Sequence, residues 1–567
     1  MLHPMNRRAS LRRLLGRSAI VGNEQRAPQR TENTTFAPKP PGAGLTPYSG
    51  EWTFEQAAHL LRRTTFGPSR ELISTAVEMG QSAVFDQLFA DPPAPAPPVN
   101  PDFTEDPNVP VGQTWVDAPY SENIDLRPYR NRSLRSWIFL NMLEEGISIR
   151  QKMTLFWINH FGVAGINDKR FMYRYIELLR SSALGNFRQL IKDVTVDGSM
   201  LIFLNGNQNT EVAPNENYAR ELLELYTVGK GDLAGEGDYS TFTEQDVAAM
   251  ARVLTGWRTF GNLNSEPENP PRVEYREFRH DNGTKQLSHR FGNAVISDLG
   301  DAEYAHLIDV IFQQDRVAHF ICRKLYQWFV YYEIDEQTEM EVIAPLAQML
   351  IDNDYELEPI VRTLLTSEHF FDILSVGPMI KNPIDYSLSM VKQLEMSLPD
   401  DQATRYEIGL RLYRLAGAME MEYMDVPQVS GWKAYFQAPQ FYRFWINAST
   451  LQIRSGLANI IAAGPMMING FAFAYDPLAF IATMSNPTDP NVVIDEFSRL
   501  LHPQPLTDQQ KVALKDILIP GLPDFEWTLE YGEYVADPEN PELANAVSLK
   551  LRQLTRALIS LAEFHLS

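Results

Sequence analysis

The sequence predicts a mainly α-helical protein, and three observations support this fold class. Apolar residues recur every three or four positions through most of the chain, as on the buried face of an amphipathic helix. Capping patterns that begin at Thr53, Thr243 and Thr507 are typical of helix N-termini. The sequence contains no series of segments with the two-residue period of strands, and no repeat of solenoid length.

The first half of the chain divides into helical segments separated by Pro-rich and Gly-rich breaks. A helix is expected from Thr53, and Gly67-Pro68 ends it. A second amphipathic segment covers residues 69–88. Residues 91–128 begin with a polyproline-type stretch, and we interpret them as a linker or a surface excursion. Helical periodicity is then dense over residues 129–231.

The second half begins with a helix that is capped at Thr243 and ends at Gly256. Residues 261–300 are rich in Asn, Pro, Gly and charge, which predicts a long irregular loop. Helices resume over about 301–460, and a turn-rich stretch follows. The spacing of apolar residues places the following side chains on buried faces of one helical core: Trp137, Trp157, Leu222, Leu254, Trp257, Leu325, Trp328 and Leu558.

Composition and charge exclude several classes of protein. The chain has 567 residues, about four domains' worth at about 150 residues each, although one large domain is also compatible. Its 44% hydrophobic and 22% charged residues are ordinary for a globular protein. The acidic net charge of −22 argues against nucleic acid as a partner. The sequence contains no apolar run of about 18 residues, the length that would predict a membrane span. The single cysteine, Cys322, excludes an internal disulfide and a Cys-based zinc cluster.

Residues 1–50 are basic and rich in Pro and Gly, which predicts a flexible, disordered N-terminal arm. Arg7-Arg8 followed by Leu11 is similar to a twin-arginine export signal. Such a signal needs an apolar stretch of about 7–15 residues, and Arg17 interrupts the one that follows here. A cytoplasmic and an exported location therefore both stay open.

Familiar catalytic signatures are absent from the sequence, so candidate site residues come from polar groups in apolar surroundings. His160 lies at a helix end among aromatic residues. It is either a core histidine with a backbone partner or a catalytic or metal-binding group.

A second group lies at the start of the helix that follows Pro214. Glu216 and Arg220 share one helix face, and Glu221 lies beside them. They form either a solvated ion-pair ladder or a buried arginine held by carboxylates that frames a site. We predict a mostly buried Arg220 bonded to Glu216, Glu221 or Glu224.

A third group lies in the long loop, where His280, Asp281 and Lys285 fall within six residues. His280 could act as a general base that Asp281 orients, while Lys285 holds an anionic group. Alternatively, these residues only pin a polar turn to the core. We predict that the loop folds back so that the His280 ring lies within about 10 Å of the His160 ring. A metal held by the two histidines with Glu216 or Glu221 is a further alternative.

Several of these segments resemble, in order, the motifs of a bacterial family called domain of unknown function 1800. The opening motif is Leu60-Leu61-Arg62-Arg63-Thr64-Thr65-Phe66-Gly67-Pro68. The further blocks are 157–162, 215–225, 242–257, His280-Asp281 with Lys285, 323–325 with 329–330, 427–432, 445–454 and 562–564. Together they extend over about residues 52–566.

This resemblance implies one large helical domain over residues 51–567, with 91–128 and 261–300 as excursions from it. It implies no established reaction and no known cofactor. Members often look exported and often occur beside a second family, domain of unknown function 1501, which is sulfatase-like and is therefore an implied partner.

Two functions remain compatible with the sequence. The first is a hydrolase that acts on an extracytoplasmic polymer or its fragments, with His160, Glu216, Arg220, Glu221, His280, Asp281 and Lys285 as its polar set. The second is a non-catalytic assembly or binding protein that acts with the sulfatase-like partner. The sequence determines neither the substrate nor whether a metal is bound.

Overall fold

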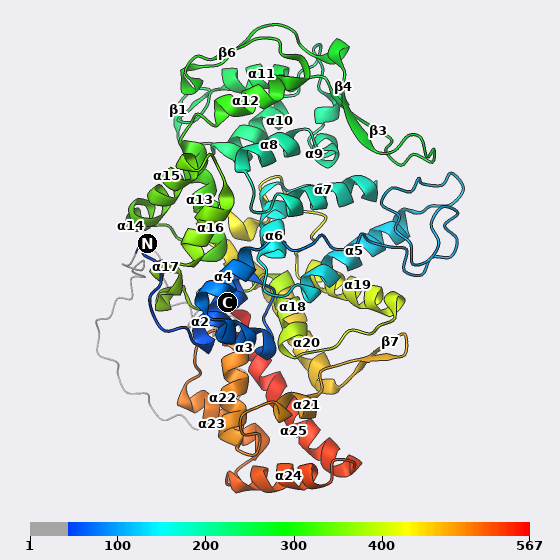
Figure 1. The fold of residues 1–567 in the computed structure, drawn as a ribbon, viewed down its shortest axis with the longest axis vertical. Helices are drawn as coiled ribbons and strands as arrows, with labels where there is room; N and C mark the ends of the chain where they lie inside the picture. The colour runs from blue at the N-terminus through cyan, green and yellow to red at the C-terminus, as the bar shows by residue number, and fades with distance from the viewer. Residues whose placement is uncertain (1–43) are drawn as a thin grey trace.

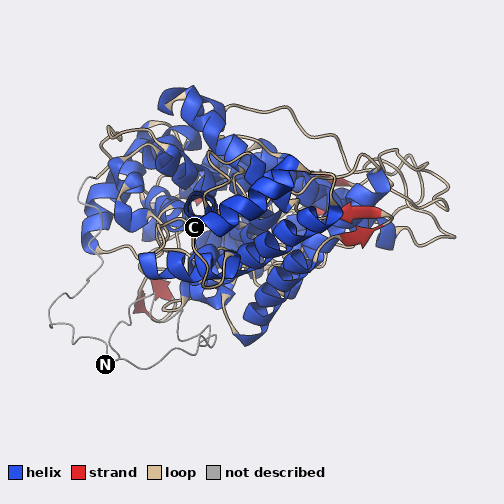
Figure 2. Cartoon of the chain, turned by 90° about the horizontal axis from the view of Figure 1, so that it is seen from below, coloured by secondary structure: helices blue, strands red, loops and turns tan. Residues whose placement is uncertain are grey.

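The computed structural model describes residues 44–567, which form helices and four two-stranded antiparallel sheets (Figures 1 and 2). The mainly α fold class is therefore confirmed. Most of the predicted N-terminal arm, including Arg7 and Arg8, lies outside the described residues. The end of that arm is held in place: Tyr48 N–H donates to the Thr366 carbonyl at 2.8 Å, and the Tyr48 ring packs on Phe371.

The upper part of the molecule in Figure 1 contains short helices and six of the strands. Its helical elements are α8 (Phe187–Thr195), α9 (Gly198–Phe203), α10 (Glu216–Glu221), the π-helical segment η2 (Leu222–Thr227), α11 (Glu244–Val253) and α12 (Glu303–Ile311). Its strands pair as β1 (Leu233–Gly235) with β2 (Asp238–Tyr239), β3 (Trp257–Phe260) with β4 (Arg272–Tyr275), and β5 (Lys285–Gln286) with β6 (Val295–Ile296).

The central part brings N-terminal helices together with elements from the middle of the chain (Figure 1). It contains α2 (Phe54–Thr64), α3 (Arg70–Met79), α4 (Gln81–Phe89), α5 (Arg127–Glu144), α6 (Arg150–His160) and α7 (Lys169–Ser181). It also contains α13 (Arg316–Phe329), α14 (Glu336–Thr338), α15 (Ala344–Asp352), α16 (Leu357–Leu365), α17 (Glu368–Phe371), α18 (Pro383–Gln393), α19 (Gln402–Ala418), α20 (Ala448–Ala463) and the hairpin β7 (Met466–Ile468) with β8 (Phe471–Phe473).

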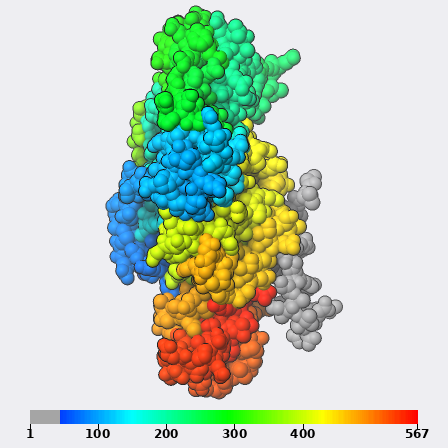
Figure 3. Space-filling view, turned by 90° about the vertical axis from the view of Figure 1, so that its right-hand side faces the viewer, coloured from blue at the N-terminus to red at the C-terminus, as the bar shows by residue number. Residues whose placement is uncertain are grey.

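The C-terminal helices form the lower end, which is orange and red in Figure 3. They are α21 (Pro477–Ala482), α22 (Pro490–Leu501), α23 (Asp508–Leu518), α24 (Phe525–Ala536) and α25 (Pro541–Ser560). After α25 the chain returns to the central part, where the Lys381 N–H donates to the His565 carbonyl at 2.8 Å. This return places the C-terminal residues beside the start of α18.

Local sequence signals account for many of the helix boundaries. Thr243 and Thr507 form capping boxes with Asp246 and Gln510, as predicted. The buried stripe of α25 has helical spacing through Val547, Leu551, Leu554 and Leu558. Among residues 44–567, no helix is both long enough and apolar enough to cross a bilayer.

One buried apolar cluster extends from Ala57 in α2 to Phe564 near the C-terminus. It includes seven of the eight predicted core residues: Trp137, Trp157, Leu222, Leu254, Leu325, Trp328 and Leu558. Trp257 is only partly buried against this cluster, because it begins the peripheral β3–β4 hairpin and packs on Tyr275 and Tyr304.

The two predicted excursions are more ordered than the sequence suggested. Within residues 91–126, Trp115 is buried and donates to Ser133 Oγ at 2.9 Å, and the Ala96 carbonyl accepts from Trp137 Nε1 at 2.6 Å. The 261–300 loop is irregular as predicted over most of its length, but it contains the short strands β4, β5 and β6. Strands this short carry too few residues to show a period in the sequence.

Candidate functional site

His160 ends α6 and is buried against the π-helical segment η2 and α13. Its Nε2–H donates to the Tyr226 carbonyl at 3.1 Å, and its Nδ1 accepts from Lys324 Nζ at 3.2 Å. Burial and the nearby Lys324 charge lower the pKa of His160 well below its usual range. Both ring nitrogens are therefore occupied in a neutral imidazole, as in a core histidine.

His280 belongs to a different, fully buried polar cluster near the start of α12. Its Nε2 lies 3.1 Å from Glu303 Oε2, and Lys285 Nζ lies 2.6 Å from Glu303 Oε1. Burial opposes a charge on His280, but the bonds to Glu303 and to Thr255 outweigh it and raise the pKa of His280 above its usual value. Glu303, which no sequence pattern singled out, is therefore the acid that joins His280 and Lys285.

Asp281 does not contact the His280 ring through its carboxylate. Arg252 binds that carboxylate with two hydrogen bonds, at 2.6 and 2.9 Å, and this pairing lowers the pKa of Asp281. Asp281 was expected to orient His280 as a general base, but the carboxylate that contacts the His280 ring belongs to Glu303. The physical reason is competition, because Arg252 on α11 offers a planar donor pair that matches the carboxylate.

The Glu216–Arg220–Glu221 group lies on α10, and its arginine is less buried than predicted. Arg220 is 31% exposed and binds Glu244 through two hydrogen bonds of 2.7 Å, whereas Glu216 is 3.7 Å away. Burial and the charge of Glu224 raise the pKa of Glu221. Arg220 is therefore part of a partly solvated ion pair between α10 and α11. It is not a buried arginine that borders a site.

The loop does fold back toward the helix that begins at α10, since the Arg279 carbonyl accepts from the Glu211 N–H at 2.9 Å. His160, in contrast, bonds to Tyr226 at the far end of that helix. A helix rises 1.5 Å per residue, so the ten residues from Glu216 to Tyr226 span about 15 Å. The hydrogen bonds of the described residues thus place the two imidazoles in separate environments.

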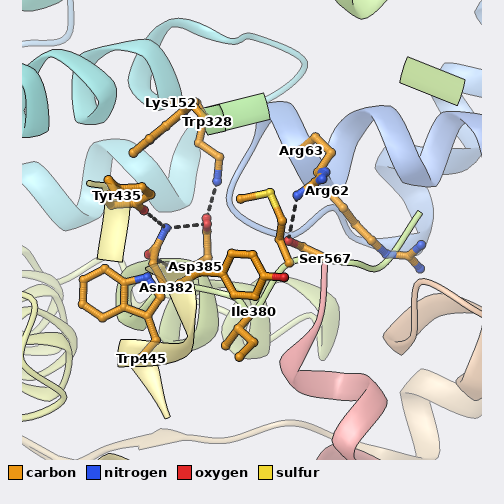
Figure 4. Close-up of a pocket in the computed structure, with 12 residues that line it drawn as sticks. Arg62, Arg63, Lys152, Trp328, Ile380, Asn382, Asp385, Tyr435, Trp445 and Ser567 are labelled. Atoms are coloured by element: carbon orange, nitrogen blue, oxygen red, sulfur yellow. Dashed lines mark hydrogen bonds and ion pairs between the residues drawn. The ribbon is translucent and has the colours of Figure 1, made fainter. Parts of the chain in front are cut away.

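A small polar pocket lies between α2, α6, α13 and α18, and it contains none of the predicted site residues (Figure 4). Its cavity volume is about 30 Å³, room for about two water-sized atoms. Arg63, Lys152, Asp385 and Asn382 contribute polar atoms, and the aromatic walls are Trp328, Tyr435, Tyr442 and Trp445.

Lys152 and Asp385 form the central ion pair of this pocket (Figure 4). Asp385 also accepts from Asn382 Nδ2 at 2.7 Å, and the same amide contacts the Tyr435 hydroxyl at 3.1 Å. Burial lowers the pKa of Lys152, although Asp385 opposes this shift. The result is a chain of polar groups in a largely aromatic enclosure.

The two arginines of the opening motif hold helix ends beside the pocket. Arg62 donates to the Arg499 and Leu500 carbonyls at the end of α22, at 2.8 Å each. Arg63 donates to the Val330 carbonyl after α13 at 2.6 Å and lies 3.4 Å from Ser567 Oγ. Burial lowers the pKa of each guanidinium to about 10. Cations suit helix C-termini, so both arginines stabilise the fold.

The sequence patterns did not single out Lys152 and Asp385, but one signal was available. Lys152, Phe156 and His160 are spaced four residues apart and therefore share one face of α6. The Phe156 ring packs on Trp328 of the pocket, with 5.6 Å between centroids. Because this lysine shares a helix face with two core positions, it is expected to be buried rather than solvated. Such a position indicates a buried charge.

The comparisons with known proteins identify the family. The profile described as Protein of unknown function (DUF1800) matches residues 59–527, which is most of the chain. No curated protein and no solved structure matches the chain. Segments on which the resemblance rests meet at the pocket, where Arg63 binds the Val330 carbonyl and Trp445 forms a wall. On this match over residues 59–527, the chain belongs to the DUF1800 family of proteins of unknown function.

Proposed function

We propose that this protein binds the anionic group of a small ligand in the Arg63–Lys152 pocket. The observation that carries the proposal is an excess of positive charge: Arg63 and Lys152 line the pocket, and Asp385 is the one carboxylate side chain among its lining residues. A buried charge without a counterion costs several kcal/mol, and a bound anion offsets that cost.

A neighbouring lysine strengthens the charge argument. Lys381 is 4% exposed, and its Nζ finds no hydrogen-bond acceptor among the described residues. Its contact is the face of the Phe564 ring, 4.1 Å away. Burial, together with the charge of Arg62, lowers the pKa of Lys381 to about 7. The interior around the pocket therefore favours anions over cations.

The pocket size limits the ligand to a small group or to the end of a larger one. A carboxylate has two oxygens, which matches room for about two water-sized atoms. The aromatic walls would pack against the apolar part of the ligand next to that group. The hydrolase function and the assembly or binding function with a sulfatase-like partner both stay predictions.

Titration calorimetry with acetate, sulfate and inorganic phosphate tests the proposal. We expect saturable binding of at least one of these anions. Lys152→Met and Arg63→Gln should each weaken it at least tenfold, since a charge-assisted hydrogen bond contributes about 1.5–3 kcal/mol. Arg127→Gln is the matched control, because Arg127 is 54% exposed on the surface. Binding of none of the three anions would reject the proposal, as would equal binding by folded Lys152→Met.

A further inference from the structure

Three potential metal ligands converge outside the pocket, at the upper end of the molecule near β6 and α12 (Figure 1). His280, Asp298 and Glu303 each offer one ligand atom, and these atoms lie within 4.8 Å of one another. Oxygen and nitrogen ligands bind first-row divalent ions at about 2.0–2.2 Å, so ligand atoms around one ion are about 3–4 Å apart. The 3.1 Å between His280 Nε2 and Glu303 Oε2 fits that spacing.

The hydrogen bonds of Thr255 determine which nitrogen of His280 carries the proton. The Thr255 hydroxyl donates to the Arg252 carbonyl at 2.7 Å and accepts from the Asp281 N–H at 2.9 Å. The Thr255 hydroxyl proton already bonds to the Arg252 carbonyl, so it is not available to His280 Nδ1. The Thr255 carbonyl, 3.0 Å from His280 Nδ1, can only accept a hydrogen bond. His280 Nδ1 is therefore the donor.

In a neutral ring with its proton on Nδ1, the Nε2 lone pair points at a carboxylate oxygen of Glu303. Two lone pairs facing each other at 3.1 Å repel unless a cation or a proton lies between them. A metal-bound histidine commonly donates its other N–H to a backbone carbonyl, as His280 does to Thr255. The contact with the Thr255 carbonyl thus orients the ring so that Nε2 faces Glu303.

The two carboxylates are also held in place by neighbouring groups. Lys285 binds the far oxygen of Glu303 at 2.6 Å, and the Leu299 N–H lies 3.3 Å from the near oxygen. The Gly300 N–H donates to Asp298 Oδ1 at 3.0 Å. His280 and Glu303 are buried, whereas Asp298 is exposed, so an ion could enter from solvent on the Asp298 side.

We propose that His280, Asp298 and Glu303 bind a divalent first-row transition metal ion. One imidazole and two carboxylates suit zinc or manganese, and three protein ligands leave further coordination positions for water. In this proposal Asp298 and Glu303 replace Glu216, Glu221 and His160 as the partners of His280. The ion would tie the loop after β6 to α12 and to the segment before β5.

The test uses the full chain after treatment with a chelator, titrated calorimetrically with zinc chloride or manganese chloride. We expect one ion per chain for at least one of these metals, and a higher melting temperature in its presence. Asp298→Asn should weaken binding at least tenfold. Because Asp298 is exposed, this variant should fold like the parent. Asp301→Asn is the matched control, an exposed acid three residues away outside the ligand group.

Two results would overturn the proposal. One is the absence of stoichiometric binding of either metal, together with a ¹⁵N spectrum in which His280 is an imidazolium, since a proton would then fill the place of the ion. The other is binding that Asp298→Asn and Asp301→Asn reduce equally, which would indicate general attraction of cations to an acidic surface. His280→Asn, with its folding checked by circular dichroism, should abolish binding if the ligand set is correct.

Discussion

Lys324 on α13 donates a hydrogen bond to His160 on α6, with 3.2 Å between Nζ and Nδ1. Since His160 Nε2–H already donates to the Tyr226 carbonyl, Nδ1 is the nitrogen with the free lone pair. Burial lowers the pKa of Lys324 to about 8. The pair therefore links two central helices, although removing the Lys324 ammonium from water is unfavourable. This unfavourable burial makes the stability of the protein depend on pH in the alkaline range.

We expect the stability of the protein to rise between about pH 8 and pH 10, partly because of Lys324. The folded state releases the Lys324 proton near pH 8, whereas the unfolded chain keeps it up to about 10.4. The unfolded state thus binds more protons in this window, and stability rises by up to about 1.4 kcal/mol per pH unit for this residue. Lys324→Met should reduce that slope, by the share that Lys324 contributes, in urea unfolding at pH 8, 9 and 10. The exposed Lys433→Met should keep it, and an unchanged slope in Lys324→Met would contradict the assignment.

His502 should change stability in the same direction as Lys324 but in the acidic range, as a loss of stability when the pH falls. It is buried, its Nε2 donates to the Leu558 carbonyl at 3.1 Å, and burial lowers its pKa to about 4. Below about pH 6.5 the unfolded chain binds a proton that the folded state does not, so stability falls by about 2 kcal/mol between pH 6.5 and pH 5. His502→Gln keeps a donor for Leu558 and should reduce that loss, as measured by urea unfolding at both pH values. Exposed His289→Gln should lose as much as the parent.

Arg62 should matter far more for stability than the arginine it contacts. Arg62→Met leaves the Arg499 and Leu500 carbonyls at the end of α22 without their donor, which should cost about 2–3 kcal/mol. Arg499→Met removes a pair with Glu55 in which both side chains are about half exposed, together with a contact on the Phe54 ring, and it should cost about 1 kcal/mol. Melting temperatures of the two variants measure this difference, and equal losses would contradict the capping role.

Arg220 and Arg170 test how burial sets the strength of an ion pair. Arg220→Ala should cost less than about 1 kcal/mol, because Arg220 and Glu244 are 31% and 42% exposed. Arg170→Ala should cost about 3–5 kcal/mol, because it leaves Asp168 fully buried without its cation. Chemical denaturation of both variants measures the two losses. A larger loss for Arg220→Ala than for Arg170→Ala would reverse the interpretation.

Gly67 should tolerate no side chain at the turn after α2. Its φ is +90°, and a Cβ there would lie 2.4 Å from the Ser389 Cα. Gly80 has a similar φ of +78° but open space around it. Gly80→Ala therefore measures backbone strain alone, about 1–3 kcal/mol, and Gly67→Ala should lose at least about 2 kcal/mol more in thermal or urea unfolding. Similar losses for the two variants would mean that the contact with Ser389 relaxes.

Local chemistry determined those parts of the protein that the sequence predicted well. The capping boxes at Thr243 and Thr507 and the apolar spacing of α25 depend only on residues within one helix. The core positions of Trp157 and Leu325 follow from the same periodicity. His160 was singled out among aromatic residues, and His280 and Lys285 were singled out within one long polar loop. All three are buried.

Tertiary structure decided which of these groups meet, because the partner of each one comes from a distant part of the chain. His160 bonds to Lys324, His280 faces Glu303, Arg220 binds Glu244, and Asp281 binds Arg252. The Lys152–Asp385 pair joins residues 233 positions apart. The sequence alone determined the helices and the buried polar candidates. Only the packing of α2, α6, α13 and α18 decided that Arg63, Lys152 and Asp385 meet in one pocket, because charge pairing depends on distance in space and not on separation along the chain.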